Sequence, residues 1–264
     1  MAPRQRFGQH FLNDPAVAAR IIDCLDLDAG LPVFEIGPGR GALTVLLLQR
    51  LPRLQAVEID RDLAAELASR YGDRGLEVHC TDVLKFDFCG AAPGPLQIVG
   101  NLPYNISTPL LFHLLDQLDC IAQMVFMLQK EVADRIAAAP GGGDYGRLSV
   151  MIQSRCRVEP LFRVGSGAFT PPPRVESRVL RLTPAAVMPA VADREVFAAV
   201  VRSAFSHRRK TLRNALKELI TAADLEALGI DPGRRPQELT VATYAALANH
   251  LSARGRRTGD DDGA

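Results

Sequence analysis

The segment PVFEIGPGRGA at residues 32–42 decides how this chain folds. Residues 32–36 form a short apolar run of the kind that makes a buried strand, and the glycine-rich turn GPGRG follows it directly. The apolar spacing of Ala42–Leu51 then predicts a helix. A strand, a tight glycine turn and a helix in this order open a βαβ unit, in which the helix start presents free N–H groups to a ligand.

The same alternation extends on both sides of this segment. Before it, Asn13-Asp14-Pro15 combines a capping side chain with a proline at the first turn, so it predicts the start of a helix that runs to Leu27. After it, strands are expected at 54–59, 76–80, 96–100 and 121–128, with helices at 61–71 and 108–118. Regular alternation of this kind predicts an α/β fold, with a parallel sheet covered by helices on both faces.

The regularity ends after Lys130. A helix at 131–138 and a glycine-rich loop at 140–145 precede two strands, 155–164 and 174–182, which are expected to close the sheet antiparallel. Beyond an Ala/Pro-rich linker at 183–192, only helical patterns remain, at 193–205, 208–220, 223–228 and 240–251. We therefore expect a first domain at 1–184, a helical domain at 185–255 and a frayed tail at 256–264.

Composition narrows the class of protein. The 264 residues are 47% hydrophobic and 23% charged, which is typical of a folded globular chain. No run of about 18 apolar residues exists and the N-terminus lacks an apolar signal-peptide core, so we expect a soluble, cytoplasmic protein. The five cysteines form no CxxC pair, which argues against a zinc site and a cysteine nucleophile and favours reduced thiols in the core: Cys24, Cys80, Cys89, Cys120 and Cys156.

The glycine turn and two strand-end acids indicate a nucleotide site. Gly37 and Gly39 let the backbone approach a ligand closely, and Glu58 at the end of the next strand offers a carboxylate to both hydroxyls of a ribose. Asp82, after the third strand, stands where an acid accepts the exocyclic amine of adenine. A tight turn without a ligand and solvated loop acids remain the alternatives. The chain lacks the second βαβαβ half that would complete an NAD-type dinucleotide site. The loop also lacks the lysine of a P-loop.

The most specific motif is Asn101-Leu102-Pro103-Tyr104, at the end of the fourth strand. The amine of a nucleobase is a poor nucleophile because its lone pair is delocalised into the ring. The Asn101 carboxamide and the Leu102 carbonyl, which Pro103 helps to aim, can accept its two N–H bonds and so orient the nitrogen. Tyr104 offers a ring face to a base taken out of its stack. An ordinary turn is the alternative.

Net charge is only +1, but its distribution is uneven. Between Val196 and Lys217 there are six basic residues and no acidic one. If 208–213 is helical, Arg208, Arg209, Lys210 and Arg213 span about 9 Å and form a broad basic surface. We expect this surface to contact RNA phosphates, with a solvated helix face as the alternative.

From Arg6 to about Leu251 the chain resembles S-adenosylmethionine-dependent adenine-N6 methyltransferases, and among them the KsgA/RsmA family of 16S rRNA dimethyladenosine transferases. The matching stretches are RFGQHFL, EIGPGRGALT, VEID, GNLPYNISTPLLF, FMLQKEVADR, YGRLSV, AFTPPPRVES and HRRKTLRN. The resemblance implies a Rossmann-like class I methyltransferase domain followed by a helical domain. It also implies S-adenosylmethionine contacts at His10, Leu12, Gly37, Glu58, Asp82 and Asn101, and a target-adenine site at Asn101, Pro103 and Tyr104.

Two positions depart from the family pattern, because His10 stands where Asn is usual and His207 where Gln is commoner. Histidine can still donate or accept a hydrogen bond, so His10 stays a candidate contact. Pro171–Pro173 predicts a rigid edge of the substrate cleft, and Phe169 beside it either supports the target base or belongs to the core.

The implied reaction transfers two methyl groups to N6 of each of two adjacent adenosines in the 3′-terminal hairpin loop of small-subunit rRNA. This reaction needs no metal. We expect the protein to be a monomer that binds 16S rRNA in the small ribosomal subunit and does not bind a membrane. The alternatives are a large-subunit rRNA adenine-N6 methyltransferase and a non-catalytic RNA-binding assembly factor. FTPPPRVES and RRKTLRN favour the small subunit, and the intact NLPY and glycine loop argue against a mere binder.

Overall fold

The computed structural model describes residues 10–92, 94–185 and 190–260, and its contacts divide the chain into two compact units. The first unit comprises the chain up to Ala133 together with Arg157–Pro184. The second comprises Asp134–Cys156 together with the chain from Ala185 onward. This division separates Pro184 from Ala185, and it groups residues 134–156, which the sequence prediction assigned to the first domain, with the second unit.

The first unit is built on a seven-stranded sheet with the strand order β4-β3-β2-β5-β6-β9-β7. Strands β2 to β6 pair in parallel, and β9 pairs antiparallel with β6 in the register Phe126↔Leu180. The predicted parallel sheet with an antiparallel closing strand is confirmed. The strands are β2 (Val33–Ile36), β3 (Leu54–Glu58), β4 (Leu76–Cys80), β5 (Leu96–Asn101), β6 (Ile121–Gln129), β7 (Cys156–Val164) and β9 (Ser177–Pro184).

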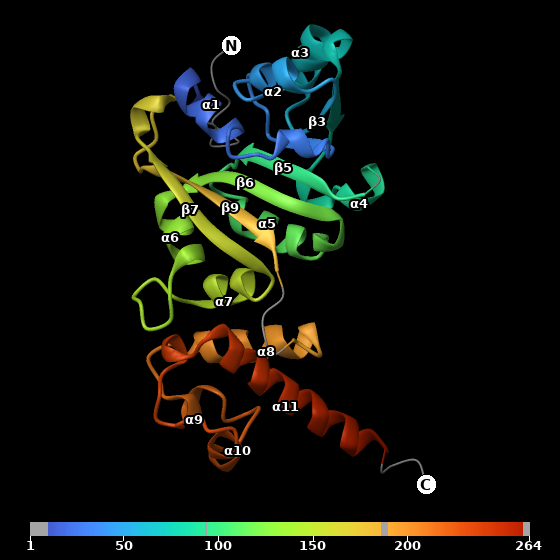
Figure 1. The fold of residues 1–264 in the computed structure, drawn as a ribbon. Helices are drawn as coiled ribbons and strands as arrows, with labels where there is room; N and C mark the ends of the chain where they lie inside the picture. The colour runs from blue at the N-terminus through green and yellow to red at the C-terminus, as the bar shows by residue number, and fades with distance from the viewer. Residues whose placement is uncertain (1–9, 93, 186–189, 261–264) are drawn as a thin grey trace. The chain divides into compact units, whose positions relative to one another are not determined.

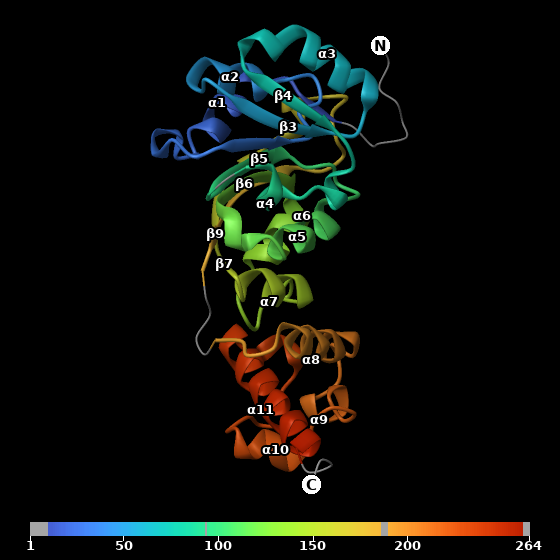
Figure 2. The same cartoon turned by 90° about the vertical axis from the view of Figure 1, so that its right-hand side faces the viewer.

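Helices cover both faces of this sheet. Helices α1, α2 and α3 lie on one face, and α5 and α6 lie on the other (Figures 1 and 2). Their bounds are α1 (Pro15–Ile22), α2 (Thr44–Arg50), α3 (Arg61–Tyr71), α4 (Phe88–Ala91), α5 (Ser107–Leu115) and α6 (Lys130–Ala137). Helix α1 begins where the sequence predicts, because the Asp14 side chain accepts the backbone N–H bonds of Ala16 and Val17. It ends at Ile22 rather than at Leu27.

The central strands are apolar because both of their faces are covered. Every residue of β2 is buried, and the core on the α1–α3 side joins Ile21, Leu47 and Leu67 from the helices to Ala56 and Val99 from the strands. Burial of an aliphatic side chain contributes about 1.5–3 kcal/mol, so this layer anchors the carboxyl ends of the strands. Strand order reverses between β2 and β5, and a crevice forms at such a reversal outside the carboxyl ends.

A second, two-stranded ladder lies beside that edge of the sheet. It pairs β1 (Phe11–Leu12) antiparallel with β8 (Phe169–Thr170), with Phe11 opposite Thr170 and Leu12 opposite Phe169. The N-terminal segment is therefore held by a segment about 160 residues further along the chain.

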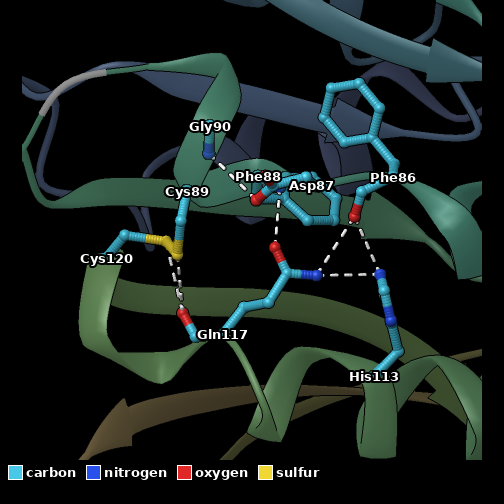
Figure 3. The surroundings of a disulfide bond; sticks show 8 residues. All are labelled: Phe86, Asp87, Phe88, Cys89, Gly90, His113, Gln117 and Cys120. Carbon is cyan, nitrogen blue, oxygen red and sulfur yellow. Dashed lines mark hydrogen bonds between the residues drawn. A yellow bond between two sulfur atoms is a disulfide. The ribbon is translucent and has the colours of Figure 1, made fainter.

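The expectation that all five cysteines are reduced core thiols is wrong for two of them. Cys89 in α4 and Cys120, at the end of the short 3₁₀ helix Leu118–Cys120, form a disulfide (Figure 3). α4 precedes β5, and Cys120 directly precedes β6, so the parallel pairing of these strands brings both segments to the same edge of the sheet. Gln117 ties the two segments further, because its Oε1 accepts the N–H of Phe88 at 2.7 Å and its Nε2 donates to the carbonyl of Phe86 at 3.1 Å.

The free thiols also differ from the core prediction. Cys156 is buried, but Cys24 is half-buried and Cys80 is exposed.

The second unit is helical. Its elements are α7 (Arg147–Gln153), α8 (Arg194–Ser206), α9 (Leu212–Ala215), α10 (Ala222–Ala227) and α11 (Val241–Asp260), and α6 crosses into it after Ala133. Their apolar faces enclose one core that includes Tyr145, Phe197, Leu212 and Tyr244. Sequence patterns did not predict α7. Its first turn is held by Ser149, whose hydroxyl accepts the N–H of Gly146 and donates to the carbonyl of Arg135.

The end of the chain differs from the expected frayed tail in one respect. Helix α11 continues to Asp260, through most of the segment expected to be frayed. Residues 261–264 of that tail, and residues 186–189 of the expected linker, lie outside the described residues.

Candidate active site

A cavity of about 390 Å³ opens at the carboxyl ends of β2, β3, β4 and β5. Its volume lies within the range of pockets that bury a small organic ligand. Every residue that the sequence predicted for cofactor or adenine contact lines it: His10, Leu12, Gly37, Gly39, Glu58, Asp82, Asn101, Leu102, Pro103 and Tyr104. The strand-end residues therefore converge as the parallel topology requires, although they come from five separate stretches of the chain.

The glycine loop forms one wall of the cavity. Gly37 and Gly39 have φ angles of +63° and +57°, in the left-handed region that side chains rarely adopt. A Cβ added to Gly39 would lie 3.1 Å from the Phe11 ring. The loop thus takes a path that only glycine allows, and it packs directly under the N-terminal strand β1.

Glu58 links that loop to the end of β3. Its Oε2 accepts the Gly39 N–H at 3.1 Å, and its Oε1 accepts the Asp60 N–H at 3.0 Å. The side chain is buried, and burial raises the pKa of Glu58 while the two N–H bonds act to lower it. A carboxylate has about four acceptor positions, so Glu58 can still accept a bond from a further donor.

Sequence reasoning missed Glu35 as a separate site residue. It lies in β2, lines the cavity, and its Oε2 accepts the Thr44 hydroxyl at 2.6 Å. Burial raises the pKa of Glu35 to about 7, and the nearby charge of Glu58 acts in the same direction. The sequence did offer a sign of this role, because Glu35 is an acid inside the apolar run PVFEI and a buried acid is rare without a partner.

Asp82 follows β4, which is two strands away from β2 and its glycine loop in the strand order. Its Oδ1 accepts the Leu84 N–H at 3.0 Å and begins a single 3₁₀ turn, Val83–Lys85. Thr81 in front of it donates its N–H to the carbonyl of Glu58 at 3.1 Å. The half-exposed Asp82 carboxylate is thereby held near Glu58, the acid at the end of β3.

The segment Asn101-Leu102-Pro103-Tyr104 leaves the end of β5. Asn101 donates from Nδ2 to the carbonyl of His10 at 3.2 Å, and Leu102 is buried with its N–H bonded to the Met127 carbonyl at 3.1 Å. Tyr104 is half-buried, and its hydroxyl lies 3.0 Å from that of Ser177. The motif is therefore tied to three neighbouring elements and is not a free turn.

The N-terminal strand closes over this edge. The His10 Nδ1 lies 2.8 Å from the carbonyl of Pro171, and its ring lies 5.6 Å from the Tyr104 ring at 32°. The guanidinium of Arg40 lies 4.6 Å above the Phe11 ring. Phe169 is buried opposite Leu12, so of its two predicted roles the structure supports that of a core residue. Residues 6–9 of the RFGQHFL stretch lie outside the described residues.

The basic segment does not form the predicted helix over 208–220. Helix α8 ends at Ser206, residues 208–210 form a turn, and α9 covers only Leu212–Ala215. The reason is that the Leu212 and Arg213 N–H groups bond to the carbonyls of Arg234 and Pro232, and Leu212 is buried. The four basic residues therefore do not share one helix face.

One of the four also has partners within its own unit. Arg208 donates to Gln237 at 3.1 Å and to the Gly143 carbonyl. Arg209, Lys210 and Arg213 are exposed.

Two further observations concern metals and membranes. Among the described residues, no three His, Cys, Asp or Glu side chains gather in a way that suits a metal ion. No helix in that part of the chain is long and apolar enough to cross a membrane.

A doubly wound sheet with this glycine loop, strand-end acids and Asn-Leu-Pro-Tyr edge, joined to a helical unit, defines a Rossmann-like class I methyltransferase. A family model described as ribosomal RNA adenine dimethylase matches residues 2–253. The chain belongs to this family.

Relatives of known name agree with this assignment. The chain is 51% identical over 263 residues to the ribosomal RNA small subunit methyltransferase A of Pseudomonas fluorescens, covering 98% of this chain and 97% of that protein. It is 53% identical over 254 residues to the protein of the same name from Thiobacillus denitrificans, covering 96% and 99% of the two chains.

Solved structures share the fold over nearly the whole chain. A dimethyladenosine transferase from Plasmodium falciparum has a TM-score of 0.79 at 27% identity, covering 93% of this chain and 98% of that one. The 23S rRNA methyltransferase ErmE has a TM-score of 0.69 at 26% identity, covering 92% and 99%.

Proposed function

We propose that this chain transfers methyl groups from S-adenosylmethionine to N6 of two adjacent adenosines in the 3′-terminal hairpin loop of 16S rRNA. The products are N6,N6-dimethyladenosines in the small ribosomal subunit. The observation that carries the proposal is the cavity at the sheet's carboxyl edge, where Asn101 and Tyr104 lie beside a glycine loop and Glu58. The relatives named as small-subunit methyltransferases support the small subunit as the substrate.

The cavity fits S-adenosylmethionine in size and in donor chemistry. Gly37 and Gly39 bring backbone to its wall without a side chain, and the Glu58 carboxylate would accept from the ribose hydroxyls. Asp82 would accept the adenine amine, and His10 and Leu12 would contact the bound molecule from the N-terminal segment that contains β1. When bound, this cofactor supplies a methyl group made electrophilic by the adjacent sulfonium.

Asn101 and Leu102 would orient the target amine. The bond from Asn101 Nδ2 to the His10 carbonyl fixes which end of the carboxamide is the donor, so Oδ1 remains as the acceptor. Carbonyl oxygens that accept both N–H bonds hold the nitrogen with its lone pair toward the methyl donor. These contacts speed methyl transfer by positioning the nitrogen and not by deprotonating it. Pro103 constrains the backbone before it, and Tyr104 packs its ring against the flipped base.

We further propose that Arg209, Lys210 and Arg213 contact rRNA phosphates, with Arg208 holding the turn that presents them. In this proposal the enzyme acts as a monomer in the cytoplasm, where small subunits are assembled. The methyltransferase domain at 1–184 would carry the chemistry, and the helical domain at 185–255 would carry part of the rRNA affinity.

The test is transfer of tritium-labelled methyl groups to purified ribosomal particles. Small-subunit particles that lack the modification should accept label, and nucleoside analysis should recover it as N6,N6-dimethyladenosine. Large-subunit particles serve as the matched control. Label in the large subunit alone would instead favour a large-subunit adenine methyltransferase, and no transfer to either particle, with RNA binding retained, would favour a binding factor.

A further inference from the structure

A buried serine contacts the hydroxyl of Tyr104. Ser177 is completely buried, and its hydroxyl lies 3.0 Å from the Tyr104 hydroxyl, although the two residues are 73 positions apart. Neither the glycine loop nor the cavity lining includes Ser177. Within the described part of the chain, Ser177 therefore contacts the site through the hydroxyl of Tyr104.

Ser177 is fixed to the sheet. It is the first residue of β9, where it pairs with Gln129 of β6, and β9 is flanked by β6 on one side and β7 on the other. The neighbouring Glu176 accepts the Lys130 N–H through its carbonyl at 2.9 Å. A hydroxyl at the start of an interior strand is a rigid reference point, unlike one on a loop.

Tyr104 is held at both of its ends. Its carbonyl accepts the Ser107 hydroxyl at 3.2 Å at the start of α5, and its own hydroxyl meets Ser177. Between these ends the ring lies near the His10 ring. A rotation of the Tyr104 side chain about its first torsion would move the hydroxyl away from Ser177 and leave the buried Ser177 oxygen without this partner, which is costly.

We infer that Ser177 is a positioning residue that holds the Tyr104 ring in the orientation at which it packs against the acceptor adenine. The inference rests on the proposed role of Tyr104 as the base platform. Holding the ring in one rotamer keeps the base at the angle that methyl transfer requires, so loss of the contact lowers the rate of the chemical step. Ser177 itself touches neither the cofactor nor the base in this arrangement.

The experiment is a double-mutant cycle with Ser177→Ala, Tyr104→Phe and the two combined, assayed on unmethylated small-subunit particles. Each single change removes one hydroxyl of the pair, and each should lower kcat by about two- to tenfold through a less well-oriented base. The double variant should be no slower than the slower single variant, because both remove the same contact. Calorimetric affinity for S-adenosylmethionine should be unchanged in all three.

A spectroscopic readout reports the contact apart from activity. With only four tyrosines in the chain, the carbon-13 signal of the Tyr104 ring carbon that bears the hydroxyl can be assigned from its absence in Tyr104→Phe. This signal should shift in Ser177→Ala. Ser154→Ala is the matched control, because it removes another buried hydroxyl, bonded at 2.8 Å to the Met151 carbonyl, and should change neither the signal nor kcat.

The outcomes separate this inference from the proposed function. Additive losses in the double variant, or a Ser177→Ala variant with wild-type kcat, would overturn the positioning role. An active Tyr104→Ala variant would overturn the platform role of Tyr104 itself. Absence of methyl transfer by the unaltered protein would overturn the function and not the contact, which the carbon-13 signal still reports.

Discussion

The Asn101 side chain donates to the backbone carbonyl of His10 at 3.2 Å, so the end of β5 that we propose to face the target amine is attached to the residue just before β1. A carboxamide can present either its oxygen or its nitrogen, and the two ends have opposite hydrogen-bonding character. The His10 carbonyl accepts only a donor, and it therefore selects the orientation in which Oδ1 stays available. This contact spans 91 positions of the chain.

Asn101→Ala and Asn101→Asp should both lower methyl transfer by about 10²–10³-fold, the range seen when a positioned hydrogen-bonding group is removed from an active site. The Asp variant keeps acceptor oxygens but cannot donate to the His10 carbonyl, so its loss tests the orientation argument. Tritium transfer gives the rate, and a gel-shift titration should show rRNA affinity close to wild type. Near wild-type dimethylation by either variant would reduce the motif to a structural turn.

Glu58→Ala should weaken S-adenosylmethionine binding by about 1.5–3 kcal/mol, as for hydrogen bonds to a charged group. The measurement is isothermal titration calorimetry, with circular dichroism to establish that the variant folds. Glu77→Ala, which removes an exposed acid from β4, is the control and should bind as the wild type does. Unchanged affinity in a folded Glu58→Ala variant would contradict the ribose role.

The sequence could predict that the candidate residues at the strand ends lie close together, because local rules govern their placement. Glu58, Asp82 and Asn101 each follow a buried strand, and parallel strands bring their carboxyl ends to one edge. The same argument needs no knowledge of long-range contacts. This explains why all of these residues line a single cavity.

Local rules of this kind could not predict contacts between segments that are distant in the sequence. The contact of Ser177 with Tyr104, and the pairing of Cys89 with Cys120, depend on which strands become neighbours. The helix expected at 208–220 failed for a related reason. Its apolar spacing is genuine, but the N–H groups of Leu212 and Arg213 are satisfied by a distant loop, and tertiary packing overrides helix propensity.

Glu35 should make stability depend on pH. Its pKa is raised by burial to about 7, above the ordinary value of 4.5 for a glutamate, so between these values the folded chain holds a proton that the unfolded chain has released. The free energy of unfolding contributed by Glu35 therefore falls as pH rises from about 4.5 to 7, by about 3 kcal/mol in total.

The neutral variant Glu35→Gln isolates this effect, since it keeps an acceptor for Thr44 but does not titrate. Urea unfolding of both proteins at several pH values should show the difference between Glu35→Gln and wild type growing in favour of the variant as pH rises. A difference that is constant across this range would contradict the shifted pKa.

Replacing Arg209 and Arg213 with Ala should weaken rRNA binding and flatten its salt dependence by about 0.7–0.9 in log–log slope per lost phosphate contact. S-adenosylmethionine affinity should not change, because the cavity lies in the first unit. Arg53 and Arg74 precede β3 and β4, at the amino ends of these strands and away from the cavity at their carboxyl ends. Arg53→Ala combined with Arg74→Ala is therefore a charge-matched control. An unchanged slope in the test variant would make this turn an ordinary solvated surface.

The Cys89–Cys120 disulfide closes a loop with a sequence separation of 31. In the chain-entropy account, a loop of this length stabilises the fold by about 3–4 kcal/mol. Cys89→Ser should therefore unfold at lower urea concentration than wild type under oxidising conditions, and the two should approach each other after reduction. Cys80→Ser, which removes an exposed free thiol, should match the wild type in both states. Equal stability of Cys89→Ser and wild type before reduction would show that no disulfide forms.

The pairing of β1 with β8 has a consequence for turnover. Dimethylating two adenosines consumes several methyl donors in succession, and each spent donor must leave a cavity that His10, Phe11 and Leu12 help to wall. If this wall moves aside for exchange, Asn101 loses the carbonyl that orients its amide. Donor exchange and methyl transfer would then occur at different times, because the Asn101 amide is held in its acceptor orientation only while the His10 carbonyl lies against it.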